Sequence, residues 1–210
     1  MIRILIADDH AIVRRGLKQI IEDSGEMRVV AEAGSGIDAL RKIREIDCDV
    51  VLLDISMPDM SGIDVLKQIH AERPHLPILI LSIYPEDQYA TRLIRSGAAG
   101  YLTKESAPSE VVKALLHVAG GKKYISPAVA EMLADEFGKD EEKLPHQILS
   151  NREYQIFLLL ASAKTVSEIA DTLALSVKTV STYRSRILDK MRLSNNAELM
   201  RYAIDNHLAQ

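Results

Sequence analysis

The feature that most constrains this chain is a set of five short apolar segments, rich in β-branched residues and separated by stretches with helical periodicity. The segments are 2–7, 29–31, 50–53, 78–81 and 100–103. Their hydrophobicity is continuous rather than alternating, which is typical of strands buried on both faces of a parallel sheet. The alternation of such strands with amphipathic helices predicts an α/β domain with a doubly wound, five-stranded parallel sheet.

The pattern changes after residue 121. Residues 127–137 have the spacing of one amphipathic helix, and 138–146 have the polar, charged composition of a linker. No strand-like run follows, and four helical patterns cover 151–162, 166–173, 177–191 and 196–207. We therefore expect three parts: an α/β domain over 1–121, a connecting helix and linker over 122–147, and a small all-α domain over 148–210.

Composition excludes several classes of protein. The longest apolar runs reach about five residues, far below the ~20 that a membrane helix needs. Arg3, Asp8 and Asp9 interrupt any apolar leader, and the single Cys48 allows neither an internal disulfide nor a cysteine cluster for zinc. We expect a cytoplasmic protein with no membrane partner.

Charged and polar residues follow the predicted strands where each one ends. Asp8 and Asp9 follow the first strand, Asp54 the third, Ser82 the fourth and Lys104 the fifth. Any one of these alone is most often a cap or a surface residue. In an open parallel sheet, however, groups beyond the carboxyl ends of the strands converge on one crevice.

Three close carboxylates repel one another unless a cation lies among them, and Mg2+ takes oxygen ligands of this kind. A metal and the ammonium of Lys104 beside a carboxylate form an arrangement suited to phosphoryl transfer, because both neutralise phosphoryl oxygens. Asp54 is the natural acceptor, and Ser82 is placed to hydrogen-bond a phosphoryl oxygen.

Four motifs at these positions resemble the receiver domain of two-component response regulators. They are ILIADDH (4–10), VVLLDISMPDMSG (50–62), ILILS (78–82) and GYLTKES (100–106). The resemblance covers about residues 1–121 and implies a flavodoxin-like fold, a bound Mg2+ and a sensor histidine kinase as the phosphate donor.

The same resemblance assigns roles to individual residues. It implies that Asp54 is the phosphoacceptor, that Asp8, Asp9, Asp54 and the backbone carbonyl of Ser56 bind the metal, that Lys104 assists, and that Ser82 and Tyr101 form a switch pair. Two positions depart from the usual pattern. Ser82 stands where many receivers have Thr, and Glu105 follows Lys104 where many have Pro, which makes a cis peptide much less favourable there.

The predicted helix 177–191 has two distinct faces. Val180, Tyr183 in part, Ile187 and Met191 share one side, whereas Lys178, Ser181, Thr182 and Ser185 share the opposite side. A face of small polar residues flanked by basic residues suits a DNA major groove, although any surface helix also has a polar face. Residues 148–210 carry eight Lys or Arg against six Asp or Glu.

The sequences LSNREYQIFLLLA (149–161) and VSEIADTLALSVKTVSTYRSRILDKM (166–191) resemble the LuxR-type helix-turn-helix. Joined to a receiver, this domain is characteristic of the NarL/FixJ class of response regulators. The resemblance implies that 177–190 is the recognition helix and that 196–207 is the dimerising helix. It also implies that the bases are contacted by Ser181, Thr182 and Ser185. The DNA backbone would lie nearer to Lys178, Thr179 and Arg184. One departure is 162–165, where the family usually has a turn with glycine.

The leading hypothesis is therefore a transcription factor, not an enzyme, in which phosphorylation of Asp54 leads to dimers that bind promoter DNA at inverted repeats. A phosphatase with an aspartyl nucleophile is one alternative, but such enzymes generally need a second Asp two residues later, where Ser56 stands. A module whose helical domain binds protein instead of DNA is the other alternative.

Overall fold

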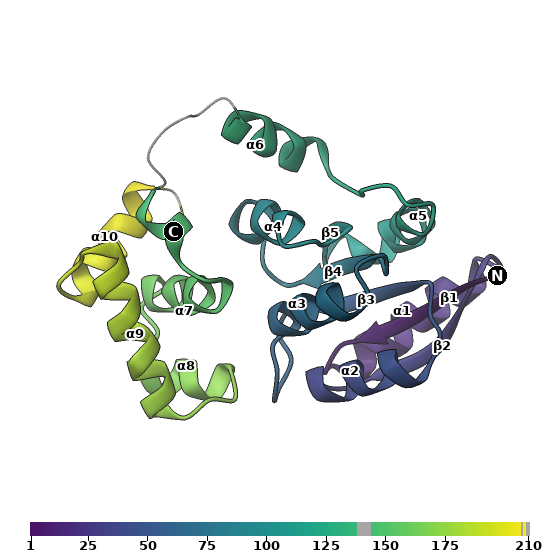
Figure 1. Cartoon of the computed structure of the whole chain (residues 1–210), viewed down its shortest axis with the longest axis horizontal. Helices are drawn as coiled ribbons and strands as arrows, with labels where there is room; N and C mark the ends of the chain where they lie inside the picture. The colour runs from purple at the N-terminus through teal and green to yellow at the C-terminus, as the bar shows by residue number, and fades with distance from the viewer. Residues whose placement is uncertain (138–143, 207, 209–210) are drawn as a thin grey trace. The chain divides into compact units, whose positions relative to one another are not determined.

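The computed structural model describes residues 1–137, 144–206 and 208, and the chain forms two compact units, Met1–Gly138 and Lys139–Gln210 (Figure 1). Of the expected linker 138–146, residues 138–143 lie outside the described residues. The described end of that segment enters a short 3-10 helix, η1 (Pro145–Ile148).

The first unit contains the predicted five-stranded parallel sheet, in the order β2-β1-β3-β4-β5. The strands are β1 (Ile2–Ala7), β2 (Met27–Ala33), β3 (Val50–Asp54), β4 (Ile78–Ser82) and β5 (Gly100–Thr103). β2 is longer than the predicted 29–31, because Met27 pairs with Ile2 and Ala33 with Ala7. β3 and β4 each end one residue later than predicted, on the buried polar side chains of Asp54 and Ser82.

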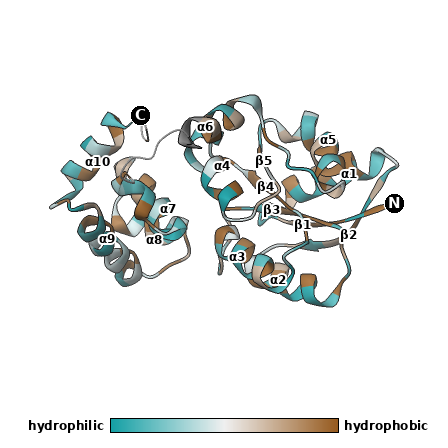
Figure 2. Ribbon diagram, turned by 45° about the horizontal axis from the view of Figure 1, so that its top comes forward, coloured by the Kyte–Doolittle hydropathy of each residue, from teal (hydrophilic) through white to brown (hydrophobic). Residues whose placement is uncertain are grey.

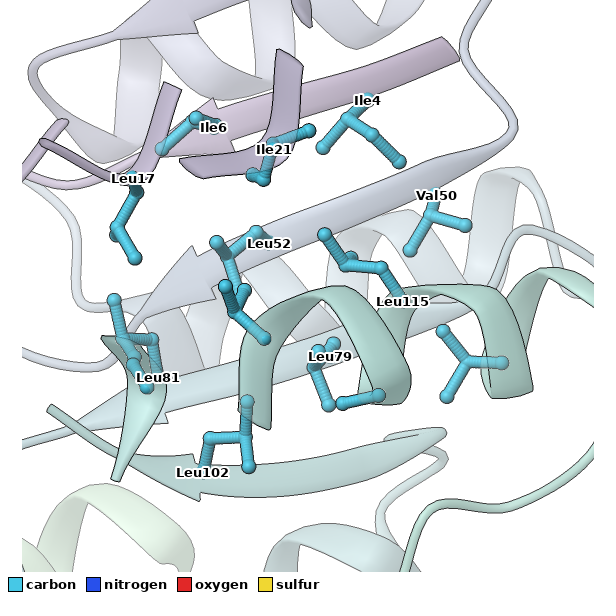
Figure 3. Close-up of a cluster of buried hydrophobic side chains, with 14 of the residues drawn as sticks. Ile4, Ile6, Leu17, Ile21, Val50, Leu52, Leu79, Leu81, Leu102 and Leu115 are labelled. Atoms are coloured by element: carbon cyan, nitrogen blue, oxygen red, sulfur yellow. The ribbon is translucent and has the colours of Figure 1, made fainter. Parts of the chain in front are cut away.

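Helices cover both faces of this sheet. Side chains from β1, β3, β4 and β5 meet those of α1 (Ala11–Asp23) and α5 (Ala107–Ala119) in one apolar core, which includes Ile4, Leu52, Leu79, Ile21 and Leu115 (Figure 3). On the other face, α2 (Gly36–Glu45) and α3 (Gly62–Glu72) lie side by side (Figure 2). α4 (Glu86–Arg95) packs against β5. Burial on both faces explains why the strand sequences are continuously apolar.

α6 (Pro127–Phe137) covers the predicted residues and packs against α4, so it belongs to the first compact unit. The segment before it follows the edge of the sheet, where the amide of Tyr124 donates to the carbonyl of Ala99 at 2.8 Å. Gly100 permits this approach, since a Cβ there would lie 2.7 Å from the Tyr124 carbonyl oxygen. Val129 is buried. The sequence pattern predicts α6 as part of a connecting segment, because helical periodicity does not show that this helix packs against α4.

The second unit is all helical, as expected. It contains α7 (Asn151–Ala161), α8 (Val166–Thr172), α9 (Val177–Met191) and α10 (Asn196–Asp205), and α7 packs against the other three. Its helices are capped by the side chains of Ser150, Thr165, Ser176 and Asn195. The predicted bounds agree within two residues, except that position 207, the predicted end of the last helix, lies outside the described residues.

The turn after α7 has the geometry of a glycine turn without a glycine. Ala163 adopts a left-handed backbone with φ of 61°. The amide of Lys164 donates to the carbonyl of Leu159 at 3.2 Å, and that of Ala163 to Leu160 at 3.1 Å. This pair of bonds is the Schellman motif, which favours Gly at the left-handed position. Residues 162–165 therefore form a turn that glycine favours, although the segment contains no glycine.

Candidate functional site

The strand ends bring two carboxylates and an ammonium into contact. The Lys104 Nζ lies 2.7 Å from Oδ2 of Asp54 and 2.7 Å from Oδ2 of Asp8. The side chains of Asp8 and Asp54 are fully buried, and that of Lys104 is 13% exposed. Among the described residues there is no cis peptide, so the Lys104–Glu105 bond is trans. With Glu105 in place of proline, the loop still directs Lys104 into the carboxylate pair.

The loop after β3 folds back onto Asp54. The amide of Ser56 donates to Oδ1 of Asp54 at 3.1 Å, and the amide of Gly62 donates to the carbonyl of Ile55 at 2.9 Å. Gly62 is required by contact, because a Cβ would lie 1.9 Å from the Asp54 carbonyl oxygen. Burial raises the pKa of Asp54 to about 6, while the Lys104 ammonium acts in the opposite direction. Asp54 is therefore a desolvated carboxyl held in a fixed orientation.

Asp8, Asp9, His10 and Asp54 each place one ligand atom within 4.8 Å of the others. The amide of His10 donates to Oδ1 of Asp8 at 2.7 Å, and its Nδ1 lies 2.6 Å from Oδ1 of Asp9. The donors are mainly carboxylate oxygens, two buried and one from the 31% exposed Asp9, which fits a hard divalent cation with water in its remaining positions. The place of the Ser56 carbonyl as a ligand stays a prediction.

Ser82 and Tyr101 meet at one backbone residue, Tyr84. The Ser82 hydroxyl accepts a hydrogen bond from the Tyr84 amide at 3.0 Å, and the Tyr101 hydroxyl donates to the Tyr84 carbonyl at 2.8 Å. Ser82 is fully buried and Tyr101 is 3% exposed, so the aromatic ring lies inside the domain. Burial raises the pKa of the Tyr101 phenol, which keeps its proton available for this bond.

Sequence reasoning missed two contributors beside the carboxylates. His10 follows Asp9 directly, but the strand-end pattern alone assigns it no role. Arg14 lies on α1, and its Nη1 donates to the backbone carbonyl of Asp8 at 2.6 Å. A basic residue in the first turn of the helix that follows the acidic pair is the available sequence signal, but it does not distinguish this contact from an exposed arginine.

α9 has the two faces that the sequence predicts. Val180 and Ile187 are fully buried and Met191 is 4% exposed. On the opposite side Lys178, Ser181, Thr182 and Ser185 are exposed. The other two predicted residues differ in their surroundings: Thr179 is partly buried and hydrogen-bonds the capping Ser176, and the Arg184 Nε donates to Oδ1 of Asn196 at 2.6 Å.

An ion pair between a buried glutamate and an exposed lysine joins α7 to α9. The Lys190 Nζ lies 2.7 Å from Oε2 of Glu153, which also accepts the Ser150 amide at 2.7 Å. Glu153 is 4% exposed. The sequence marks Ser150 and Glu153 as a capping box, but the 37-residue separation from Lys190 hides the ion pair.

Comparison with known families settles which class these two units represent. Residues 4–116 match the family described as "Response regulator receiver domain". Residues 147–203 match the family described as "Bacterial regulatory proteins, luxR family". The chain is a response regulator of the NarL/FixJ class.

Relatives of this response regulator share its whole length. The response regulator GacA of Pseudomonas viridiflava is 40% identical over 205 residues, covering 97% of this chain and 96% of GacA. The response regulator UvrY of Escherichia coli K12 is 37% identical over 209 residues, covering 99% and 96%. A structure of the Salmonella typhimurium RcsB response regulator aligns with a TM-score of 0.69 and 25% identity, covering 100% of this chain and 98% of RcsB.

A second RcsB structure, from Salmonella enterica serovar Typhimurium, is bound to promoter rprA in the presence of phosphomimetic BeF3-. It aligns with a TM-score of 0.66 and 27% identity, covering 96% of this chain and 97% of RcsB. The response regulator thus combines a receiver domain with a LuxR-type DNA-binding domain and belongs to a family that regulates transcription rather than to a typical enzyme family. In the described part of the response regulator, no helix has both the length and the apolar character needed to span a bilayer.

Proposed function

We propose that the response regulator is phosphorylated on Asp54 by a sensor histidine kinase. An oxygen of the Asp54 carboxylate attacks the phosphorus of the kinase phosphohistidine. The new P–O bond forms as the P–N bond breaks, and the imidazole nitrogen leaves with the electron pair and takes a proton from solvent. Burial of Asp54 beside the Lys104 ammonium supports this assignment, because a cation next to a desolvated carboxylate can neutralise incoming phosphoryl oxygens.

The residues around Asp54 fit a bound Mg2+, which supplies charge neutralisation for the phosphoryl group. Asp8, Asp9, Asp54 and the backbone carbonyl of Ser56 would hold it. The existing carboxylate cluster supports this set, since its ligand atoms lie within 4.8 Å of one another. Lys104 serves a second phosphoryl oxygen, and Ser82, fully buried at the end of β4, hydrogen-bonds a third.

The same geometry supports Ser82 and Tyr101 as the proposed switch pair. The Ser82 hydroxyl accepts the Tyr84 amide, whereas toward a phosphoryl oxygen it would donate its proton. We expect Ser82 to shift toward Asp54 to make that bond, and so to move away from the Tyr84 amide. Tyr101 is tied to the carbonyl of the same Tyr84. Movement of Ser82 toward Asp54 therefore acts on the residue whose carbonyl also binds the Tyr101 hydroxyl, and this carries the change to the loop between β4 and α4.

The second unit is proposed to bind promoter DNA as a homodimer, with α9 in the major groove of each half of an inverted repeat. Ser181, Thr182 and Ser185 face the bases, and Lys178, Thr179 and Arg184 lie nearer the backbone. The exposed polar face of α9 supports the assignment, as do the RcsB structures, which include a promoter complex and two dimers bound to two parallel DNAs. Two linked half-site contacts supply affinity that one helix lacks.

The observation that carries this proposal is the contact of Lys104 with both Asp54 and Asp8. Its direct test is treatment of the protein with phosphoramidate and Mg2+, followed by intact-mass analysis and peptide mapping. We expect one added phosphoryl group on Asp54, and none in Asp54→Asn. Asp23→Asn, an exposed aspartate on α1, is the matched control and keeps the modification. Labelling at another aspartate contradicts the proposal.

The second test selects fragments from a random DNA pool with and without beryllofluoride and Mg2+. Enrichment of an inverted repeat only with the mimic supports gating and dimeric binding. Enrichment both with and without the mimic supports DNA binding but contradicts its control by phosphorylation of Asp54. No enrichment in either state contradicts DNA binding and favours a protein partner for the second unit.

A further inference from the structure

Val177, the first residue of α9, is an apolar side chain that the fold leaves outside its core. It is 52% exposed, whereas the other aliphatic residues of α9 are buried: Val180 and Ile187 are fully buried and Leu188 is 8% exposed. α9 packs against α7 and α8, and its buried aliphatic side chains lie further along the helix. Val177 therefore keeps an exposed apolar surface that the described second unit does not cover.

The position of Val177 on the helix connects it to the exposed polar face. It precedes Ser181 by four residues and Ser185 by eight, so the three side chains follow one another along one side of α9. In helix-turn-helix proteins the N-terminal residues of the recognition helix contact base edges. The proposed function makes α9 that helix, and Val177 stands at its first position.

The start of α9 is held in place, which fixes the direction of the Val177 side chain. The Ser176 hydroxyl accepts the Thr179 amide at 3.0 Å and contacts the Thr179 hydroxyl at 2.7 Å. Valine is branched at Cβ and strongly prefers one rotamer in a helix. Its two methyl groups therefore present a defined apolar surface with little entropy left to lose on contact.

The polar neighbours of Val177 use their hydroxyl protons within the helix. The Thr182 hydroxyl donates to the carbonyl of Lys178 at 2.9 Å, and the Ser185 hydroxyl donates to the carbonyl of Ser181 at 3.2 Å. These hydroxyls keep acceptor capacity but have spent their one donor. These two hydroxyls are therefore less able to distinguish bases by donating hydrogen bonds, and an apolar contact becomes more important for base recognition.

Thymine is the base that places a methyl group in the major groove, where apolar side chains recognise it. We propose that Val177 is a specificity-determining residue that contacts a thymine methyl group in each DNA half-site. This inference rests on the proposed function, because it takes α9 as the recognition helix. It adds a base contact that lies outside the polar set Ser181, Thr182 and Ser185.

The test is a double-mutant cycle between protein and DNA. The probe is the duplex most enriched in the pool selection, with each thymine of the half-site replaced in turn by deoxyuridine, which lacks only the methyl group. For wild-type protein with beryllofluoride and Mg2+, we expect one such replacement to weaken binding about four-fold, the value of one buried methyl group. In Val177→Ala, binding to the unmodified duplex weakens by at least that factor, and the same replacement then adds less than two-fold.

Two controls keep the result interpretable. Ile148→Ala truncates another exposed apolar residue of the second unit, 47% exposed in η1, and should retain the full sensitivity to deoxyuridine. Val177→Thr keeps the β-branched shape and one methyl group, so it should lose less affinity than Val177→Ala. Circular dichroism confirms that each variant retains its helical content.

The inference is overturned if Val177→Ala and every deoxyuridine replacement weaken binding independently of each other. It is also overturned if Val177→Ala binds the unmodified duplex with wild-type affinity. Either result leaves the proposed function intact, because the wild-type protein still binds the selected duplex. Failure of the wild-type protein to enrich any duplex is a different outcome, which overturns the proposed DNA binding and this inference together.

Discussion

The hydroxyl of Ser126 donates a hydrogen bond to Oε2 of Glu86 and thereby joins the residue before α6 to the first residue of α4. The Ser126 hydroxyl oxygen also accepts the amide of Val129 at 3.3 Å and so caps α6. Glu86 lies two residues after Tyr84, whose amide and carbonyl bind Ser82 and Tyr101. One short loop therefore connects the switch pair to the last helix of the first unit.

Ser126→Ala should loosen α6 without unfolding the domain. Loss of a serine N-cap costs about 1 kcal/mol, and here the bond to Glu86 is lost as well. Hydrogen exchange of the α6 amides at Val129 and Ala130 should accelerate about five-fold or more, in line with that free energy. Ser109→Ala removes an exposed hydroxyl on α5 that binds only the Ser106 carbonyl in the described contacts, and it should leave α6 exchange unchanged. Equal exchange in Ser126→Ala and wild-type protein contradicts a capping role.

The sheet was predictable from sequence because each strand is buried on both faces and therefore continuously apolar. The same logic located Asp8, Asp54, Ser82 and Lys104, since a charged or polar residue directly after such a run has to lie at the carboxyl edge of the sheet. The receiver and LuxR-type resemblance, confirmed by both family matches, then named the class.

Contacts that depend on how helices are oriented and packed were not predictable in this way. The bond from Arg14 to the Asp8 carbonyl and the pair of Glu153 with Lys190 depend on how helices turn and pack, which periodicity leaves open. The docking of α6 likewise depends on Tyr124 reaching over Gly100. Ala163 shows the reverse case: a turn type survives although its sequence signal, glycine, is missing.

Ala163→Gly should stabilise the second unit. Ala163 is exposed and adopts φ of 61°, a conformation that costs a non-glycine residue roughly 1–2 kcal/mol. Part of this gain is offset by the greater freedom of glycine in the unfolded chain, so we expect a net stabilisation of about 0.5 kcal/mol. Urea unfolding followed through NMR signals of α7 and α8 measures it. The matched substitution Ala197→Gly, at an exposed position inside α10, should instead destabilise by about 1 kcal/mol.

Lys178→Ala should weaken DNA binding by removing a positive charge, and the loss should be the same for every DNA sequence. Lys178 is exposed at the start of α9, where an ammonium can reach a phosphate. The plot of log affinity against log salt concentration has a negative slope, and loss of one phosphate contact makes it less steep by about 0.9 for each α9 bound to DNA. Binding titrations at several salt concentrations, on the selected duplex and on unrelated DNA, should show the same reduction for both. Lys67→Ala, which removes an exposed lysine on α3, should retain the wild-type slope. A loss confined to the selected duplex assigns Lys178 to base recognition instead.

The ion pair between Glu153 and Lys190 should give the second unit a characteristic pH dependence. Burial acts to raise the pKa of Glu153, but hydrogen bonds from Lys190 and from Ser150 outweigh it and hold the pKa below its usual value. A depressed folded-state pKa stabilises the fold above the unfolded-state pKa of about 4.3, and that stability is lost as pH falls through the folded value. Because Lys190 is 43% exposed, we expect only about 1–2 kcal/mol at neutral pH.

Glu153→Gln should therefore be less stable than wild-type protein at pH 7, and the difference should shrink as pH falls below about 4. Urea unfolding followed through NMR signals of α7 and α9 across this pH range makes the comparison. Lys190→Met removes the partner, so the Glu153 pKa should rise and the acid-dependent loss of stability should become smaller. Lys178→Met removes an exposed lysine from the same helix and should reproduce the wild-type curve. If Lys190→Met and Lys178→Met behave alike, the ion pair does not stabilise α9 against α7, and the cap formed with Ser150 accounts for the burial of Glu153 by itself.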